Sequence, residues 1–541
     1  MMLPPGINQK TWSSALAEFR KAVGEQWVFT ADEDVALYRD AYSPLWNEPQ
    51  ERLVSAAVAP MEVAQVQAIV RTANKYRIPI YTISTGKNLG YGGSAPNLSG
   101  SVVLDLKRMN RVIEADDKRH YAIVEPGVTY FDLYRHLQEK NLKCWIDCPD
   151  PGWGSLIGNA LDHGVGHTWY SYRDHFNSHC GMEVVLPNGE LLRTGMGALP
   201  GANTWSDFRY GFGPYVDGLF GQGNYGIVTK MGFHLMPEPD AYLSRQVLVP
   251  RRRDIIPLTE IVNELEYGGI IGMPEYLSPL SLFRYAEQDS GLLNIFKQPD
   301  VWTSDALDRY AASKKTAFWS CNLQFYGPKE GVEANWRYAQ AKFARAIPEV
   351  RFEELETLRF PLTTDQAEAA QHKVLVGIPN MNIFSLGARS QMNPNPRDGH
   401  LLFSPIIART GEAVLEAQQV FAQALAGTEL EFIFNPTTSP YTWINRAFAL
   451  VAGFPVSRSD QSVNQKSREA VEKLIKIGAE HGYGEYRTPP LFQDRVMDTY
   501  SYNNHALKRF AETLKDAVDP NGILAAGRSG IWPKHLRKGR V

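Results

Sequence analysis

The pattern of apolar and polar positions near the start of the chain predicts a strand, a helix and a second strand. Residues 53–60 are an apolar run, and residues 61–76 carry apolar side chains at helical spacing. The second apolar run, residues 78–84, leads into a glycine-rich loop. Further strands and a helix are expected over residues 101–106, 121–125 and 130–140, and a hairpin with an Asn-Gly type I′ turn over residues 182–193. This order predicts an α/β layer.

The pattern changes after residue 240. Pro237-Glu238-Pro239 marks a plausible boundary, and longer helical stretches then alternate with apolar strands up to about residue 480. The predicted helices cover residues 253–265, 331–346, 412–426 and 465–482, with one more at 504–517. This second part is therefore expected to be a separate α+β domain.

Three glycine-bearing loops each adjoin a predicted strand. The first, residues 84–93, contains four glycines, and the others surround Gly158 and Gly223. Glycine permits positive φ and close backbone approach, so such loops can point several N–H groups at one anion. The first loop fits neither the P-loop pattern, since Lys87 precedes Asn88, nor the G-x-G-x-x-G fingerprint. By itself it fits a cofactor loop or a tight structural turn.

Composition limits the partners of the chain. A length of 541 residues favours two or three domains, and a net charge of −3 without a basic block gives no support for a nucleic-acid partner. The first residues lack a signal-peptide pattern, and no apolar run approaches the roughly 18 residues of a membrane helix. The four cysteines form no C-x-x-C pair. A reduced, cytoplasmic setting without a membrane partner is expected.

Two acids lie in a loop punctuated by proline and glycine. Asp147 and Asp150 belong to the stretch Asp-Cys-Pro-Asp, where acids commonly cap their own backbone. The alternative is acid–base chemistry, for which a buried carboxyl group is suited. The residues alone leave both interpretations open.

Two histidine pairs have the i, i+4 spacing of metal ligands on a helix, at positions 163/167 and 175/179. Gly164 and Gly166 argue against a helix at the first pair, and the second lacks the H-E-x-x-H context. No metal site is therefore predicted. His400 opens an apolar strand and, by itself, is typical of a satisfied core or edge histidine.

Six short blocks stand out along the chain: Gly90-Tyr-Gly-Gly93, Gly181-Met-Glu-Val-Val185, Tyr210-Gly-Phe-Gly-Pro-Tyr215, His400-Leu-Leu-Phe-Ser-Pro405, Gly484-Glu-Tyr-Arg-Thr488 and Asp519-Pro-Asn-Gly522. In this order they resemble the vanillyl-alcohol oxidase family of flavoproteins, in particular its branch that acts on para-substituted phenols. The resemblance implies an α+β, two-domain FAD-binding fold of the p-cresol methylhydroxylase type. Residues 1–240 and 484–541 would form the FAD domain, and residues 241–483 a cap domain over the flavin.

The resemblance also implies how FAD is held. His400 matches the histidine that carries FAD covalently through the flavin 8α-methyl group. A fungal member uses an N-terminal histidine to assist attachment, whereas this chain has none before His120, so the assisting group stays open. The implied cofactor-binding residues are Ser84, Thr85, Gly86, Lys87, Asn88, Leu89, Gly90 and Gly93 at the diphosphate, with Gly158, Asn159, Gly223, Gly226, Ile227 and Val228 lining the same cofactor.

Catalytic roles follow from the same resemblance. Tyr91, Tyr486 and Arg487 would surround the phenolic oxygen, with Arg528 there or at the flavin pyrimidine. Asp150 would be the acid beside flavin N5, and Asp147 the alternative. The implied substrate-pocket residues are Leu402, Phe432 and Phe434.

The implied reaction is hydride transfer from the benzylic carbon of a 4-hydroxybenzyl alcohol, 4-alkylphenol or 4-allylphenol to flavin N5. A para-quinone methide forms, and O2 reoxidises the flavin to give hydrogen peroxide. The histidyl link favours O2 over the alternative, a cytochrome-coupled dehydrogenase of the same fold. The presence of Tyr91, Tyr486 and Arg487 argues against a flavin carrier without catalysis. A homodimer or larger homo-oligomer is expected.

Overall fold

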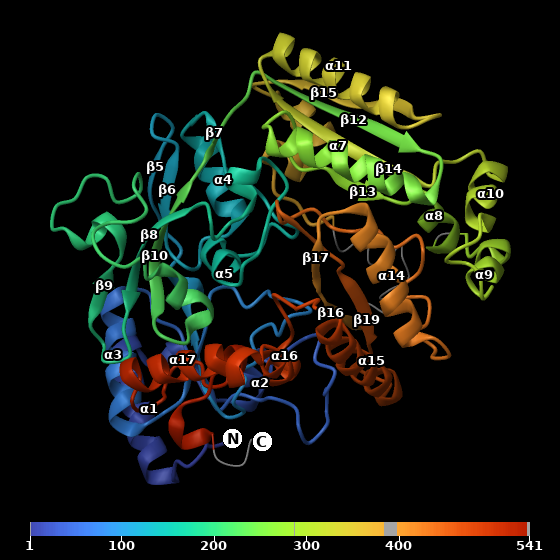
Figure 1. Ribbon diagram of the computed structural model, residues 1–541. Helices are drawn as coiled ribbons and strands as arrows, with labels where there is room; N and C mark the ends of the chain where they lie inside the picture. The colour runs from blue at the N-terminus through green and yellow to red at the C-terminus, as the bar shows by residue number, and fades with distance from the viewer. Residues whose placement is uncertain (1, 286, 383–397, 538–541) are drawn as a thin grey trace.

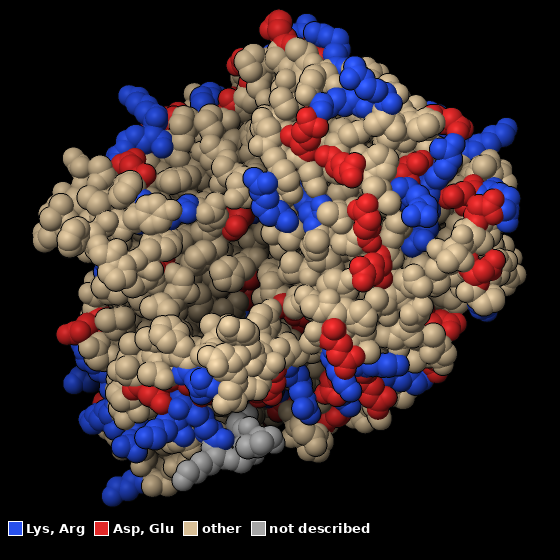
Figure 2. All heavy atoms as spheres, in the orientation of Figure 1, with Lys and Arg blue, Asp and Glu red and all other residues tan. Residues whose placement is uncertain are grey.

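The computed structural model describes residues 2–285, 287–382 and 398–537. Two regions lie side by side (Figure 1): one combines the beginning of the chain with its C-terminal segment, and the other holds the middle of the chain. Acidic and basic side chains are intermingled over the face seen in Figure 2, which is hollowed between the two regions. Within the described residues, no helix is long and apolar enough to cross a membrane.

The first sheet of the N-terminal region has the order β1-β2-β4-β3. Its strands are β1 (Val28–Phe29), β2 (Ala56–Val58), β4 (Val102–Asp105) and β3 (Ile80–Ile83), and β2, β4 and β3 run parallel. Helices α1 (Gln9–Val23) and α3 (Val63–Tyr76) share one hydrophobic core with this sheet. The short helix α2 spans Asp32–Ala36. The predicted α/β opening is confirmed.

The second sheet of this region is antiparallel, with the order β5-β6-β10-β8-β9. Its strands are β5 (Val112–Asp116), β6 (Tyr121–Val124), β10 (Ile227–His234), β8 (His179–Val185) and β9 (Leu191–Arg193). Around it lie α4 (Tyr130–Glu139), α5 (Leu156–Leu161), α6 (Tyr170–Arg173) and the pair β7 (Cys144–Trp145) and β11 (Met236–Pro237).

The hairpin between β8 and β9 exists, but its predicted type I′ turn is wrong. Gly189 has a φ of 83°, whereas Asn188 is not among the residues with positive φ, and type I′ requires both. The N–H of Leu186 donates to the Glu190 carbonyl at 2.9 Å, which closes a three-residue loop. Pro187 begins that loop, and its fixed negative φ suits a type I turn followed by a left-handed glycine.

The middle of the chain builds an antiparallel sheet of order β13-β14-β12-β15 and two strand pairs, β16 with β19 and β17 with β18. The strands are β12 (Ala241–Val249), β13 (Glu275–Leu277), β14 (Trp319–Gly327), β15 (Arg351–Arg359), β16 (Gly399–Phe403), β17 (Ile406–Ala408), β18 (Ala447–Ala449) and β19 (Ala452–Val456). The helices are α7 (Ile255–Tyr267), α8 (Leu280–Tyr285), α9 (Ser290–Phe296), α10 (Ala306–Ser313), α11 (Lys329–Ala346), α12 (Thr364–Ala369), α14 (Gly411–Leu425) and α15 (Gln461–Glu480). Apart from α12, these elements share a separate hydrophobic core, which fits a second domain.

The C-terminal segment returns to the first region (Figure 1). It contains α16 (Gln493–Thr499) and α17 (Tyr502–Val518), and backbone hydrogen bonds join Ile80 of β3 to Ile523 and Ala525. Three residues at the start of α17, Asn503 to His505, have positive φ, so its regular part begins after them. The limits at 240 and 483 stay predictions.

Candidate active site

The glycine loop packs directly against strand β16. A Cβ added to Gly90, whose φ is 80°, would lie 3.3 Å from Cδ2 of His400 and 3.1 Å from the Leu402 side chain. Only glycine therefore allows this approach. The fold brings the loop to His400 and Leu402 although about 300 residues of chain separate them.

His400 is electrically neutral at physiological pH. Burial lowers the pKa of its imidazole to about 4, and its ring centroid lies 4.9 Å from that of Tyr42. A neutral imidazole carries one unprotonated ring nitrogen and can act as a nucleophile.

The three glycine-bearing loops meet around one buried carboxylate, Asp162. Its Oδ2 accepts hydrogen bonds from Asn88 at 2.7 Å and from Nε of Arg487 at 2.6 Å. Its Oδ1 accepts from Nη2 of Arg528 at 2.7 Å and from Gln222. We name these five residues the Asp162 cluster. Asp162 was not predicted from the sequence, because its partners are 60 to 366 positions away and no local spacing indicates it.

The Asp162 cluster carries more positive than negative charge. Burial would raise the pKa of Asp162, but Arg487 and Arg528 hold it below the usual value, so the carboxyl group is ionised. Burial also disfavours the charged form of Arg487, but Asp162 outweighs this and raises its pKa. One carboxylate thus faces two guanidinium groups. Since a buried charge is costly unless paired, the arrangement favours a bound anion.

Tyr91 lies against this charge. The guanidinium carbon of Arg487 lies 4.0 Å from the centroid of the Tyr91 ring, and the Tyr91 hydroxyl lies 2.6 Å from Oγ of Ser404. Arg487 also donates to the Asn88 side chain at 2.5 Å. Burial raises the pKa of Tyr91 and Tyr486, so both phenols stay protonated and can donate. The structure thus groups Tyr91, Tyr486, Arg487 and, through Asp162, Arg528.

Glu485 adds no negative charge to this group near neutral pH. Burial raises its pKa to about 8, and its Oε1 accepts the Ser404 N–H at 2.8 Å. Sequence interpretation missed Glu485, although it immediately precedes the predicted Tyr486 and Arg487. A protonated acid here preserves the positive character of the site.

The predicted cofactor loops are neighbours. A Cβ on Gly158 would lie 2.1 Å from Oγ of Ser84, so the first loop packs on the start of α5. Lys87 is exposed, with Nζ 5.0 Å from the Trp153 ring centroid. The other predicted positions lie as follows: Thr85, Gly90, Gly226, Ile227 and Val228 are buried, Gly86, Leu89, Gly93 and Gly223 are half-buried, and Ile227 and Val228 begin β10.

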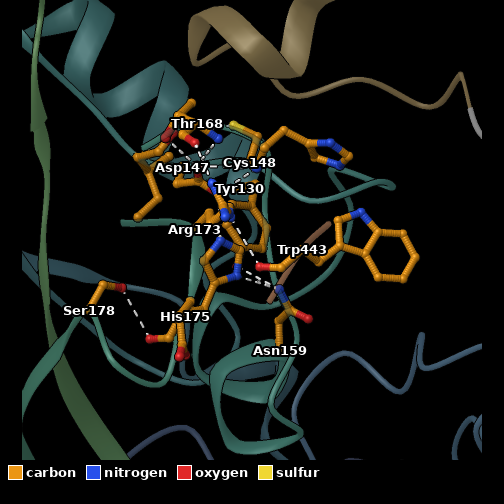
Figure 3. Close-up of polar contacts among 12 residues, drawn as sticks. Tyr130, Asp147, Cys148, Asn159, Thr168, Arg173, His175, Ser178 and Trp443 are labelled. Carbon is orange, nitrogen blue, oxygen red and sulfur yellow. Dashed lines mark hydrogen bonds and ion pairs between the residues drawn. The ribbon is translucent and has the colours of Figure 1, made fainter. Parts of the chain in front are cut away.

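Asp147 is held by a network of hydrogen bonds (Figure 3). It accepts hydrogen bonds from the backbone N–H of His167 at 3.1 Å, from the N–H of Thr168 at 2.7 Å, and from the Thr168 hydroxyl. Nε2 of His175 donates to it at 2.8 Å. We name these four residues the Asp147 cluster. Nδ1 of His175 in turn accepts from Asn159 at 2.7 Å, which fixes a predicted cofactor residue.

Asp150 has a different environment from Asp147. Its side chain is 24% exposed, and its Oδ2 lies 3.6 Å from Nε2 of His167. Its Oδ1 is buried and has no hydrogen-bond partner among the described residues. This carboxyl group is therefore available to a ligand, whereas Asp147 is committed to the backbone of a loop.

The predicted substrate-pocket residues separate in the structure. Leu402 lies against Gly90, beside His400. Phe434 is 1% exposed, with its ring centroid 5.0 Å from that of Phe421, so it belongs to the core of the middle region. Phe432 packs near Phe296 of α9 at a centroid distance of 6.2 Å. Of the three, Leu402 is the one whose contacts include the glycine loop.

The chain is similar to known flavoproteins. The family model described as an FAD binding domain matches residues 54–195. The chain is 31% identical to the flavoprotein subunit of 4-cresol dehydrogenase [hydroxylating] from Pseudomonas putida, over 98% of each chain. The structure of 4-ethylphenol oxidase from Gulosibacter chungangensis superposes with a TM-score of 0.82 at 33% identity, covering 99% of this chain and 100% of that one. p-Cresol methylhydroxylase gives a TM-score of 0.83 at 30% identity, covering 98% and 99%.

Proposed function

Because the chain belongs to the family of phenol-oxidising flavoproteins that includes vanillyl-alcohol oxidase and p-cresol methylhydroxylase, we propose that it oxidises para-substituted phenols at the benzylic carbon. The proposed substrates are 4-hydroxybenzyl alcohols, 4-alkylphenols and 4-allylphenols, and the acceptor is O2. Bound FAD would supply the two-electron acceptor for the hydride.

The observation that carries this proposal is the surplus positive charge of the Asp162 cluster beside Tyr91. A phenol has a pKa of about 10, so ionising it at pH 7 costs about 4 kcal/mol. A nearby cation lowers such a pKa by about 1–3 units, and hydrogen bonds to the anion lower it further. Arg487 would provide the charge, and the hydroxyls of Tyr91 and Tyr486 the hydrogen bonds. The phenolate then donates the electron density that hydride loss requires.

The residues that would hold FAD fit the group. Gly90 and Gly158 let the first loop pack against His400 and against α5, where a Cβ would collide, and the glycine loops offer backbone N–H groups for a diphosphate. The neutral imidazole of His400 suits covalent attachment. If it is attached, acid-precipitated protein stays yellow, and His400→Ala releases the colour. FAD in the supernatant of the unmodified protein would contradict the attachment.

Asp150 would handle protons at the benzylic carbon. A carboxylate can accept the proton of a benzylic hydroxyl or of attacking water when it lies within hydrogen-bond reach. The support is the buried, unpartnered Oδ1 within the described part of the chain. Asp150→Ala should slow substrate oxidation sharply, and an unchanged rate would reassign the role.

The electron acceptor has one alternative. Similarity to a 4-cresol dehydrogenase flavoprotein subunit over nearly the whole chain favours transfer to a partner protein such as a cytochrome. We propose O2 instead because a histidyl flavin link accompanies oxidase activity in the family and His400 is suited to it. One hydrogen peroxide per substrate oxidised would support the oxidase. Turnover only with an artificial acceptor would support the dehydrogenase.

A small substrate panel tests the function as a whole. Purified protein should oxidise 4-hydroxybenzyl alcohol, 4-ethylphenol and 4-allylphenol. The meta isomers are matched controls, because a meta oxygen cannot conjugate with the benzylic carbon in a quinone methide. Equal rates for para and meta isomers would contradict the proposal. The domain limits and a homodimeric or larger assembly remain part of the same proposal.

A further inference from the structure

His167 is a titratable side chain without a role in the reaction proposed above. Its Nε2 lies 3.6 Å from Oδ2 of Asp150, and its side chain is 13% exposed. Its Nδ1 and Oδ1 of Asp150 are both buried without a hydrogen-bond partner among the described residues. Buried polar atoms without partners are uncommon. Oδ1 of Asp150 and Nδ1 of His167 are therefore suited to take part in proton transfer.

The Asp147 cluster fixes where His167 lies. Both oxygens of Asp147 accept the backbone N–H of His167, at 3.1 and 3.2 Å. A Cβ on Gly166 would lie 1.3 Å from Oδ1 of Asp147, so the chain can pass this close only as glycine. The backbone that carries the imidazole is therefore anchored to a buried carboxylate. Because its backbone is anchored, the His167 ring stays close to Asp150 and can exchange a proton with it in every catalytic cycle.

We infer that His167 relays the proton that Asp150 takes from water during product formation, a step that rests on the proposed phenol oxidation. The water oxygen bonds to the exocyclic carbon of the quinone methide, and the electron pair of that double bond moves to the ring oxygen as phenolate. The O–H bond that breaks gives its proton to Asp150. His167 Nε2 then takes this proton from Asp150, and its partly exposed ring releases the proton to solvent. No further oxidant is needed, because water addition is not a redox step.

This role makes His167 a positioning and relay residue, because it acts through Asp150. It also separates two fates of one intermediate. The quinone methide of 4-ethylphenol gives 1-(4-hydroxyphenyl)ethanol by water addition, or 4-vinylphenol by loss of a methyl proton. The relay assists the first fate, so the ratio of alcohol to vinylphenol reports on it.

The test compares holoenzyme variants with 4-ethylphenol as substrate. His167→Gln keeps a polar side chain but cannot carry a proton near neutral pH, and His167→Phe removes both properties. The relay predicts that both lower the ratio of alcohol to vinylphenol at least about tenfold. FAD content and Tm should match those of the unmodified protein. Asp150→Asn should lower the ratio as well, and combining it with His167→Gln should add little, because the two residues act in one path. His481→Gln, at an exposed position, is the matched control and should keep the ratio.

Each other outcome overturns the inference. If His167→Gln changes the ratio of alcohol to vinylphenol less than about twofold, the ring has only a structural role. The same conclusion follows if His167→Phe lowers the ratio and His167→Gln does not. If the two substitutions lower the ratio additively in the double variant, His167 and Asp150 act independently. Vinylphenol as the sole product of the unmodified enzyme means that no water addition occurs, while phenol oxidation stands. Neither product from the unmodified enzyme refutes the proposed function and the relay together.

Discussion

Two buried aspartates 15 positions apart in the sequence differ in their partners. Asp147 is 2% exposed and accepts hydrogen bonds from backbone, hydroxyl and imidazole groups of nearby loops. Asp162 is 6% exposed and lies between two arginines of the C-terminal segment. The first arrangement fixes a loop, whereas the second leaves a surplus of positive charge. Residue type and burial alone therefore do not identify a binding site; the charge of the partners does.

The largest expected effect contrasts the two aspartates in stability. Asp162→Asn leaves two buried guanidinium groups without a counter-charge, which should cost about 3–5 kcal/mol of unfolding free energy. Asp147→Asn replaces an acceptor of backbone, hydroxyl and imidazole donors and should cost about 1–3 kcal/mol. Denaturant unfolding of the two variants measures both values. An equal loss in both would remove the contrast.

The next effect is on catalysis. Arg487→Met removes one of the two cations and leaves Asp162 paired with Arg528, so the surplus charge disappears. The kcat/KM for para-substituted phenols should fall about a hundredfold or more. Arg468→Met, which disrupts an ion pair with Glu48, serves as control and should keep kcat/KM. A similar fall in both variants would point to a general structural effect.

Tyr91→Phe should have a smaller effect. It removes one hydroxyl beside the site and leaves the glycine loop unchanged, so FAD content should stay the same. Loss of one hydrogen bond to an anion is expected to lower kcat/KM about tenfold. Tyr76→Phe, whose hydroxyl bonds to Glu18 at the surface, is the matched control. Loss of FAD together with activity would contradict a role at the substrate.

The smallest effect is a pH dependence set by Glu485. Its folded-state pKa, about 8, lies above the ordinary value of 4.5 because of burial. The stability it supports is therefore fully present below about pH 4.5 and is lost as pH rises through about 8. Above that pH an ionised Glu485 also opposes an anion at the site. Between pH 6 and pH 9 the Tm of Glu485→Gln should fall less than the Tm of the unmodified protein. Curves of Tm against pH that run parallel would refute this.

Local pattern was enough to predict the longer elements. The strand–helix–strand opening, the helices α7, α11, α14 and α15 of the middle region and the C-terminal helix α17 follow apolar periodicity, whereas the short helices α8, α9, α10 and α12 were not predicted. The wrong turn type has a local physical cause, because Pro187 occupies the first position of the hairpin loop. The resemblance placed Phe434 in the substrate pocket, and the structure shows its ring 5.0 Å from that of Phe421 in the core of the middle region; its role in the pocket stays a prediction.

The candidate site was less predictable from the chain. The resemblance to a flavoprotein family indicated Tyr91, Tyr486, Arg487 and His400, and the structure groups the first three around one charge. Asp162 and Glu485 were missed because their importance depends on partners far along the chain and on burial. Neither property leaves a periodic signal in a single sequence.

The most direct test of the surplus charge is the ionisation state of a bound phenol. 4-tert-Butylphenol has no benzylic hydrogen, so it can bind without being oxidised, and its pKa of about 10 keeps it neutral in solution at pH 7. An ultraviolet difference spectrum of the holoenzyme with this ligand reports phenolate directly. We predict a phenolate spectrum with one proton released per ligand bound, and loss of that spectrum in Arg487→Met. A neutral phenol spectrum at full occupancy would contradict the account.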